Sequence, residues 1–537
     1  MKKILLFLVL AAFAAGCRAE AMADGFGEER LLPLISINTV DPGEGTAFVT
    51  KPVKANVSEA IASWTPGYVI PPEPYYVDCT VSCTGTDGGI SVDCAEAQVK
   101  VRGNWTTSYE KKPLRIKFEK KQSLCGLNGG REFKNWVLLA EYKDLSMLRN
   151  KAGFDLAHRI LGKDLYCSDC MLVEVEINGE YWGVYLLAEQ QECAEGRVNV
   201  PEPKKDDTGT DVGYFLEFDG YYYLEDRLRS FTINYADFAP LIPFNGDIGA
   251  RPFTPLTTDP SNRNNVGYTI KSSIRSENQR IAIRDFVSNA YRIMYAAAYQ
   301  DTALEMTPDR RSTVYARKTP REAVEAVVDV GSLADMYILS EIVCDPDVYW
   351  SSFFISVDLS ENGDKRLRFE APWDFDSSMG NRYVCVDAKG FHAANAVDDV
   401  DHRYRAINPW LAVLMQKDWF REIIAEKWTA LYDSGAFSET VGMIRQDSVI
   451  YKDAFTRNYE RWSNMADKSP LDYELNREAF NCRSEAESAE QWPTGLSGGS
   501  SFLTDSGTSS ADILRRPRRC RISLSCAVRR TVPISGI

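Results

Sequence analysis

Runs of alternating apolar and polar residues predict β-strands in the first half of the chain. Successive side chains of a strand point to opposite faces, so an alternating run buries one face and exposes the other. The alternating runs are Leu31–Val40, Ala97–Arg102, Leu114–Phe118 and Gly213–Asp219. One further run, Trp136–Ala140, is continuously apolar. Two more, Leu172–Ile177 and Tyr181–Ala188, flank Asn178-Gly179 and predict a hairpin. Residues 96–219 are therefore expected to form an antiparallel sheet.

A helical period predicts one long helix within this region and most of the structure after residue 276. The first helix is expected at Met147–Leu161, with Ser146 as its N-cap and Gly162 at its end. The later helices are expected at Gln279–Tyr299, Pro320–Val328, Ser332–Val343, Pro409–Met415, Trp419–Tyr432 and Phe437–Trp462. The predicted fold class is α+β, with a β-rich N-terminal lobe and a mostly helical C-terminal lobe.

A second hairpin is predicted between these helices, within residues 345–380. Two strand-like runs, Phe353–Val357 and Leu367–Phe369, flank a polar turn at 361–364. Asp347 precedes the first strand, and Asp374 and Asp376 follow the second, so the open end of the hairpin should bring the three carboxylates together. Clustered carboxylates are costly unless they hold a hard cation such as Mg²⁺ or share a proton. The alternative is a surface hairpin with two acidic loop ends.

The composition indicates a globular protein with more than one domain. The chain has 537 residues, of which 44% are hydrophobic and 26% are charged. Its net charge of -14 argues against sequence-independent binding of nucleic acid, which needs a basic surface. Only three histidines occur, His158, His392 and His402, so a serine hydrolase or a histidine-rich zinc site is not expected.

The N-terminus has the pattern of a secretion signal over residues 1–17. Lys2-Lys3 precede the apolar run Ile4–Ala15, which is too short to span a bilayer. Ala14-Ala15-Gly16-Cys17 resembles a bacterial lipobox, in which Cys17 would be lipidated. Cleavage by an ordinary signal peptidase is the alternative. Either route predicts an exported protein. The lipobox route would hold it at a membrane through the lipid anchor alone, with residues 18–30 as a tether, whereas ordinary cleavage would give a secreted protein.

Export permits disulfide bonds, and the chain contains 13 cysteines. Cys79, Cys83 and Cys94 flank a polar, glycine-containing loop and could hold one bridge. Cys167 and Cys170 have CxxC spacing, but no second pair lies at zinc-finger distance. We interpret this pair as structural.

The last segment, residues 492–537, departs from the pattern of the rest. The helical period ends abruptly near Gln491, and the segment finishes in an arginine-rich stretch. Alternative codon readings of the same stretch give amphipathic sequences, so we hypothesise a frameshift near Gln491. Sequencing the gene across codons 485–510 tests this hypothesis.

Several motifs in this order resemble the spore-coat protein H (CotH) kinase family, whose members are secreted or surface proteins. The motifs are Arg102-Gly103-Asn104, Lys111-Lys112-Pro113-Leu114-Arg115-Ile116-Lys117, Trp136-Val137-Leu138-Leu139-Ala140, Leu148-Arg149-Asn150, Asn178-Gly179-Glu180-Tyr181-Trp182-Gly183-Val184-Tyr185-Leu186-Leu187-Ala188-Glu189, Arg197-Val198-Asn199-Val200 and Pro372-Trp373-Asp374-Phe375-Asp376. They cover about residues 96–470. The resemblance implies an atypical protein-kinase-like fold of two lobes, the N-lobe at 96–219 and the C-lobe at 220–491, preceded by a β and loop region at 31–95.

The resemblance also implies roles for single residues. Asp347 would orient the acceptor hydroxyl as the catalytic residue, and Asp374, with Asp376, would bind the metal. Ser352 stands where many relatives carry a metal-binding Asn, and Asp345 stands where an Asn often precedes the catalytic Asp. The remaining implied roles concern ATP. Its phosphates would be held by Arg102, Asn104 and either Lys112 or Lys117. Its adenine would lie along the strand edge from Tyr185 to Glu189.

Together these features predict an exported kinase that transfers the γ-phosphate of ATP to Ser or Thr hydroxyls of a protein acceptor, with Mg²⁺ or Mn²⁺. The alternative is a non-catalytic surface module for attachment or assembly, which the aromatic segment 220–255 with Tyr221-Tyr222-Tyr223 would serve.

Overall fold

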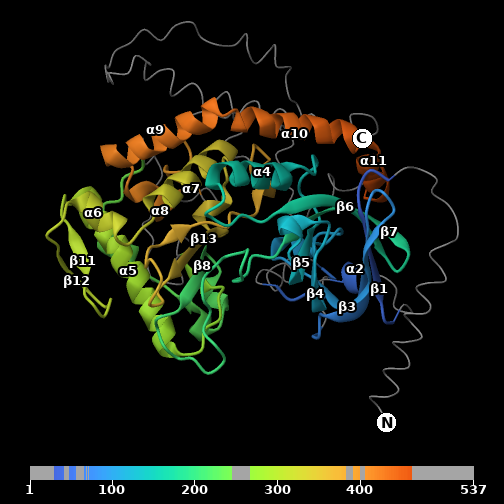
Figure 1. Ribbon diagram of the computed structural model, residues 1–537, viewed down its shortest axis with the longest axis horizontal. Helices are drawn as coiled ribbons and strands as arrows, with labels where there is room; N and C mark the ends of the chain where they lie inside the picture. Colours follow the sequence, from blue (N-terminus) through green and yellow to red (C-terminus); the bar gives the residue numbers. More distant parts are fainter. Residues whose placement is uncertain are drawn as a thin grey trace, which may run out of the picture. The chain divides into compact units, whose positions relative to one another are not determined.

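The computed structural model describes residues 30–41, 47–51, 53–55, 66–67, 69–70, 72–244, 266–381, 391–398 and 405–462. The predicted signal peptide with Cys17, the tether up to residue 29 and the tail 492–537 lie outside the described residues. The chain divides into two compact units (Figure 1). Of the described residues, the first unit takes in those within 30–142, 169–190 and 447–462, and the second takes in those within 143–168 and 191–446.

The first unit is built on a closed barrel of seven strands. In order around the barrel they are β1 (Leu34–Thr39), β2 (Val77–Thr84), β3 (Ile90–Val101), β4 (Leu114–Gln122), β5 (Phe133–Leu139), β7 (Glu180–Glu189) and β6 (Cys170–Ile177). Neighbouring strands are antiparallel except β1 and β6, whose parallel pairing closes the barrel. Alternate residues such as Ile37, Val99 and Ile116 are fully buried, as the alternating pattern requires.

Helix α11 (Lys452–Arg461) contacts strand β7 of this barrel. The side-chain oxygen of Asn458 accepts hydrogen bonds from the backbone N–H of Val184, at 3.0 Å, and from the ammonium of Lys111, at 2.9 Å. Lys111 is fully buried, and this burial lowers its pKa to about 7. A short helix, α2 (Ala47–Thr50), contacts β3.

The second unit contains a five-stranded sheet in the order β14-β13-β8-β10-β9. Its strands are β8 (Gly213–Asp219), β9 (Ser230–Phe231), β10 (Gly267–Ile270), β13 (Phe353–Asp358) and β14 (Arg368–Phe369). The helices with most of their residues here are α4 (Arg149–Leu161), α5 (Glu277–Tyr299), α6 (Pro320–Glu325), α7 (Val330–Val343), α8 (Pro409–Val413), α9 (Asp418–Asp433) and α10 (Ala436–Ile450). Two small ribbons complete it, β11 (Leu304–Met306) with β12 (Thr313–Tyr315) and β15 (Val397–Asp398) with β16 (Arg405–Ala406).

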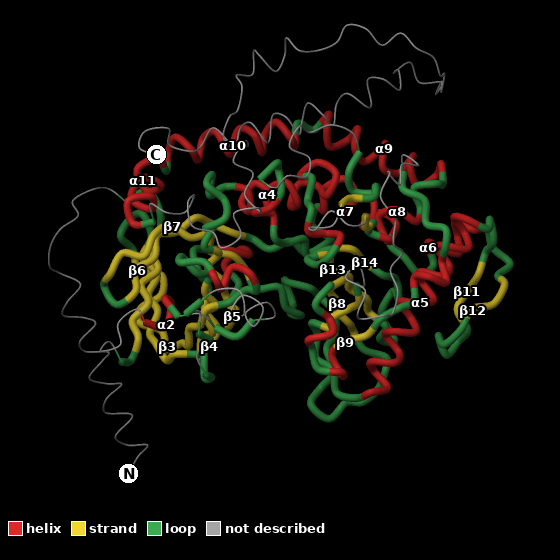
Figure 2. The backbone as a smooth tube through the Cα atoms, turned by 180° about the vertical axis from the view of Figure 1, so that it is seen from behind, coloured by secondary structure: helices red, strands yellow, loops and turns green. Residues whose placement is uncertain are grey.

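Helix α7 is the central helix of the second unit (Figure 2). It contacts α4, α8, α9 and strand β14, and its residues 332–343 are buried on every side. Its buried carboxylates have partners: Asp335 pairs with Lys427 at 2.9 Å, and Glu341 accepts hydrogen bonds from the backbone N–H groups of His392 and Ala393. Paired carboxylates make such complete burial possible.

The predicted kinase-like fold of two lobes is wrong, although the α+β content and the β-rich N-terminal half agree in part with the structure. The strands of that half close into a barrel instead of an open sheet, because β1 pairs with both β2 and the distant β6. Strand β8, expected in the same sheet, instead pairs with β10 and β13 in the second unit. Closure depends on pairing between segments far apart in the sequence, which the local pattern does not specify.

The predicted start of helix α4 is also wrong. The helix begins at Arg149 instead of Met147, and its N-cap is Leu148 instead of Ser146. Asp144 accepts hydrogen bonds from the backbone N–H groups of Leu148 and Arg149, at 3.1 and 2.8 Å. A carboxylate at a helix N-terminus also interacts favourably with the helix dipole. The predicted end is confirmed, since Gly162 follows the last helical residue with a φ of 69°.

Among the described helices, none has both the length and the apolar character needed to cross a bilayer. Among the described residues, Cys79, Cys83 and Cys125 are free thiols, and the sulfurs of Cys83 and Cys125 lie 3.4 Å apart. Cys94, which lies near Cys83 in the sequence, instead accepts a hydrogen bond from Ser82.

Candidate metal centre

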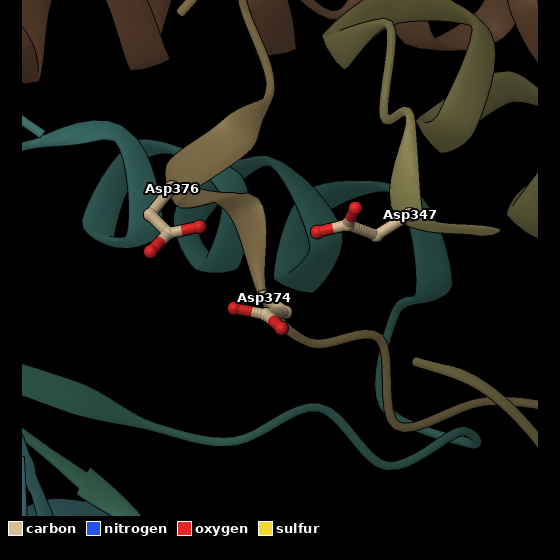
Figure 3. A group of neighbouring side chains, drawn as sticks. All are labelled: Asp347, Asp374 and Asp376. Atoms are coloured by element: carbon tan, nitrogen blue, oxygen red, sulfur yellow. The ribbon is translucent and has the colours of Figure 1, made fainter. Parts of the chain in front are cut away.

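The predicted central hairpin is confirmed, and its open end holds a cluster of carboxylates. Strands β13 and β14 pair antiparallel, with Ile355 opposite Phe369. Asp347 lies in a 3-10 turn before β13, and Asp374 and Asp376 lie at a second 3-10 turn after β14. One oxygen of each of the three carboxylates lies within 4.8 Å of the others. Figure 3 shows Asp347 approaching from one segment, and Asp374 and Asp376 from the other.

Helix α4 fixes the segment that carries Asp374 and Asp376. Asp374 adopts the left-handed conformation, with a φ of 71°, and the residue that separates the two acids, Phe375, is buried. The backbone N–H of Phe375 donates to the side chain of Asn150 at 2.7 Å, and its ring lies edge-on to Phe154 at 5.5 Å. The anchored Phe375 therefore determines where both carboxylates lie.

Asp345 supports the other side of the cluster. It is 3% exposed, and its carboxylate accepts a hydrogen bond from the backbone N–H of Asp347 at 2.9 Å. Burial raises the pKa of Asp345 well above its usual range, and the negative charges of Asp347, Asp374 and Asp376 raise it further. The surroundings of Asp345 thus carry an excess of negative charge, which a cation would relieve.

Ser352 lies beside the cluster, where the sequence placed it as a candidate ligand. Its hydroxyl is 3.5 Å from a carboxylate oxygen of Asp374, which is long for a hydrogen bond. Its backbone N–H donates to Glu217 of β8 at 3.0 Å, and Glu217 pairs with Lys271 at 2.8 Å. Sequence reasoning missed Glu217, because only the β8–β13 pairing brings it here.

Lys143 is a second residue that sequence reasoning missed. Its ammonium donates to the hydroxyl of Ser377 at 2.5 Å, and that hydroxyl lies 3.4 Å from a carboxylate oxygen of Asp376. The side-chain amide of Asn381 donates to the backbone carbonyls of both Lys143 and Asp376. The ammonium of Lys143 therefore places a positive charge next to the acidic cluster. No local pattern in the sequence predicted this.

The residues predicted to bind the nucleotide belong to the first unit, whereas the three acids belong to the second. Arg102 follows β3, and Asn104 precedes a 3-10 turn at Trp105–Ser108. The buried ammonium of Lys112 donates to the backbone carbonyls of Thr107 and Tyr109, and burial lowers its pKa to about 8.

Lys117 and Glu189 are the other two residues predicted to bind the nucleotide. Lys117 is exposed on β4. Glu189 is buried at the end of β7, where it accepts hydrogen bonds from Asn128 and from the backbone N–H of Asp169. The roles of all five residues in nucleotide binding stay predictions.

The donors at the cluster fit a hard divalent cation. Three carboxylates offer oxygen ligands, the type that Mg²⁺ and Mn²⁺ prefer, and the described part of the chain places no histidine or cysteine among them. The three negative charges repel one another, and a bound cation would reduce that repulsion. The three carboxylates can therefore bind a cation at the open end of the hairpin.

Comparison with known proteins gives one finding. The sequence model of a protein family described as CotH kinase protein matches residues 99–485. No curated protein matches the chain.

Proposed function

Because this chain belongs to the CotH kinase protein family, which indicates a kinase-like function with ATP and a divalent metal, we propose that it is a metal-dependent protein kinase. The proposed reaction transfers the γ-phosphate of ATP to a Ser or Thr hydroxyl. The observation that carries the proposal is the cluster of Asp347, Asp374 and Asp376 at the end of the hairpin. Phosphoryl transfer depends mainly on positioning and on charge neutralisation, and such a cluster serves both.

Asp374 and Asp376 would supply the oxygen ligands of Mg²⁺ or Mn²⁺. When bound, this cation would neutralise charge on the transferring phosphate. The anchored Phe375 would hold both ligands in place, so little reorganisation would be needed when the cation binds. Ser352, with its backbone fixed by Glu217, would be a weaker oxygen ligand on the same side.

Asp347 would orient the acceptor. Its carboxylate would accept a hydrogen bond from the Ser or Thr hydroxyl, directing the oxygen lone pair of that hydroxyl at the phosphorus. The hydrogen bond from the Asp347 backbone N–H to Asp345 would fix this segment. The proton of the acceptor hydroxyl would move toward Asp347 as the new P–O bond forms and the bond from the γ-phosphorus to the bridging oxygen breaks, with ADP as the leaving group.

The compartment and the acceptor are further parts of the proposal. The N-terminal signal with Cys17 supports export and a lipid anchor, and the net charge of -14 favours neutral or basic acceptor proteins.

A surface attachment module remains the second candidate, and the exposed aromatic segment favours it. Tyr222 is buried, but the adjacent Tyr223 and Leu224 are 55% and 49% exposed. Exposed aromatic and apolar side chains of this kind are used in contacts with partners. Such a module would need neither ATP nor a cation.

Transfer of labelled phosphate from ATP to the chain itself and to a generic basic protein tests the proposed function. We expect incorporation with Mg²⁺ or Mn²⁺, none after chelation, and loss of label in Asp347→Asn. Glu361→Gln is the matched control, because Glu361 is an exposed acid in the turn of the same hairpin. Absence of both transfer and cation-dependent ATP binding in the wild type would favour the attachment module.

A further inference from the structure

Two cysteines from separate parts of the barrel lie with their sulfur atoms in contact. Cys83 is buried near the end of β2, and Cys125 is half-buried in the loop that follows β4. Their sulfurs are 3.4 Å apart, although 42 positions of sequence separate the two residues. Strands β2 and β4 are not neighbours, because β3 lies between them. The loop after β4 therefore has to fold back to bring the two thiols together.

The fold separates Cys83 from the two cysteines with which the sequence grouped it. Ser82 and Cys83 are consecutive residues of β2, so their side chains point to opposite faces. Cys94 lies with Ser82: its backbone N–H donates to the Ser82 hydroxyl at 2.9 Å, and its sulfur accepts from that hydroxyl at 3.6 Å. Cys79 shares the face of Cys83 but lies four residues away, about 13 Å along the strand, which is too far for a disulfide. The geometry therefore pairs Cys83 with Cys125.

The contact between the sulfurs makes one of the two thiols acidic. The hydrogen bond from Cys125 lowers the pKa of Cys83 to about 6, against the opposing effect of burial, and the same contact raises the pKa of Cys125 above its usual range. At neutral pH the pair therefore carries one proton and one negative charge. A thiolate is the reactive form in thiol–disulfide exchange, and the half-buried Cys125 gives an oxidant access to the pair.

The loop that begins at Cys125 also holds the end of strand β7. The backbone N–H of Asn128 donates to the carboxylate of Asp169 at 2.9 Å, and its side-chain amide donates to Glu189 at 2.6 Å. Glu189 is the last residue of β7, and Asp169 directly precedes β6, so one loop residue fastens two neighbouring strands of the barrel. Only two residues separate Cys125 from Asn128, so a constraint on Cys125 also restrains Asn128.

We propose that Cys83 and Cys125 are a reversible redox pair, which a disulfide oxidant such as glutathione disulfide converts to a disulfide that braces the loop 125–130 against β2. In the reduced form, hydrogen bonds hold this loop. In the oxidised form, a covalent bond also ties it to β2, and Asn128 passes that constraint to the end of β7. The pair acts without a nucleotide or a cation, so it is independent of the proposed function.

Oxidation of the pair takes two exchange steps. Cys125 attacks one sulfur of the oxidant while its proton passes to Cys83, which gives a mixed disulfide and releases the other sulfur of the oxidant as a thiolate. Cys83 then gives its proton to that thiolate and attacks the sulfur of Cys125, and the remaining half of the oxidant leaves as a thiolate. The two cysteines lose two electrons to the oxidant, which ends as one thiol and one thiolate. Dithiothreitol in excess reverses both steps.

Incubation of the full chain with glutathione disulfide, followed by a peptide map without reduction and by hydrogen–deuterium exchange, tests the proposal. We expect a link between Cys83 and Cys125. The backbone amides of Asn128 and Asp169 both donate hydrogen bonds that fasten the loop, so their exchange should be at least about tenfold slower than in the reduced chain. Dithiothreitol should restore the original rate.

Two variants separate the disulfide from other effects of the oxidant. In Cys125→Ser the exchange rates should not respond to glutathione disulfide, because serine keeps a hydroxyl at this position but forms no disulfide. Cys79→Ala is the matched control, because Cys79 is a buried cysteine of the same strand outside the pair, and it should form the link as the wild type does.

The pairing and the brace can fail separately. Glutathione attached to Cys125 without a link to Cys83, a link from Cys83 to another cysteine, or no modification at all would overturn the pairing. A link that leaves the exchange of the Asn128 amide unchanged would overturn the brace, as would slower exchange that Cys125→Ser also shows. A link that an excess of dithiothreitol does not break in the folded chain would overturn the reversibility.

Discussion

Replacing Gly153 of α4 with alanine should displace Phe375 and, with it, the carboxylates of Asp374 and Asp376. A Cβ at residue 153 would lie 2.2 and 2.3 Å from ring carbons of Phe375 and 2.8 Å from its Cβ. Carbon atoms in contact are normally about 3.5–4.0 Å apart, so Phe375 has to move by more than about 1 Å. Because Phe375 separates Asp374 from Asp376, both acids would move with it.

The magnitude follows from three contributions. Overpacking of a filled core costs about 1–3 kcal/mol, and alanine in place of glycine gains about 1 kcal/mol in a helix. If the hydrogen bond from the Phe375 N–H to Asn150 also breaks, a buried donor loses its partner at a further cost of about 1–3 kcal/mol. We therefore expect a net loss of up to about 2 kcal/mol if the hydrogen bond survives and about 1–5 kcal/mol if it breaks. Mn²⁺ affinity should fall about tenfold or more, as for other residues that position metal ligands.

Urea unfolding and Mn²⁺ titration measure the two effects. Gly442→Ala in α10 is the control, because a Cβ there would meet no atom within 4 Å and should stabilise the chain by about 1 kcal/mol. If Gly153→Ala also raised the urea midpoint and bound Mn²⁺ as the wild type does, the positioning role of Phe375 would be refuted.

Three further predictions concern other parts of the chain. Mild oxidation should join Cys83 and Cys125, whose sulfurs are 3.4 Å apart, and a peptide map without reduction should show the link; the closed loop should add about 4 kcal/mol of stability. Burial raises the pKa of Asp219 to about 6, so the folded chain favours the neutral form of this carboxyl group. Its contribution to the free energy of unfolding is therefore fully present below about pH 4 and is lost as the pH rises through 6. Asp219→Asn should therefore gain up to about 3 kcal/mol relative to the wild type between pH 4 and 8, measured by urea unfolding at each pH; a constant difference would contradict this. Asp345→Asn keeps an acceptor for the N–H of Asp347 but removes one negative charge, so the melting temperature should rise while Mn²⁺ affinity falls; a lower melting temperature would argue against this account.

The sequence was sufficient for elements whose signals are local. The hairpin of β13 and β14 followed from two apolar runs around a polar turn, and with it the approach of Asp347 to Asp374. The end of α4 followed from Gly162, since a left-handed residue is needed there.

Features that depend on distant pairing could not be predicted. Barrel closure requires β1 to lie beside β6, and an alternating run does not specify its neighbours. The same limit applies to the site: Glu217 reaches Ser352 only through the β8–β13 pairing, and Lys143 reaches Ser377 across 234 positions of sequence. Their residue types gave no local signal, because a strand glutamate and a loop lysine are usually solvated.

Mn²⁺ binding followed by electron paramagnetic resonance, in the presence of ATP, tests the central claim most directly. The claim is that Asp347, Asp374 and Asp376 form one divalent cation site at the open end of the hairpin. We predict one tightly bound Mn²⁺ per chain in the wild type and in Glu361→Gln, and its loss in Asp374→Asn. Equal binding by the wild type and Asp374→Asn, with both chains folded, would contradict the claim.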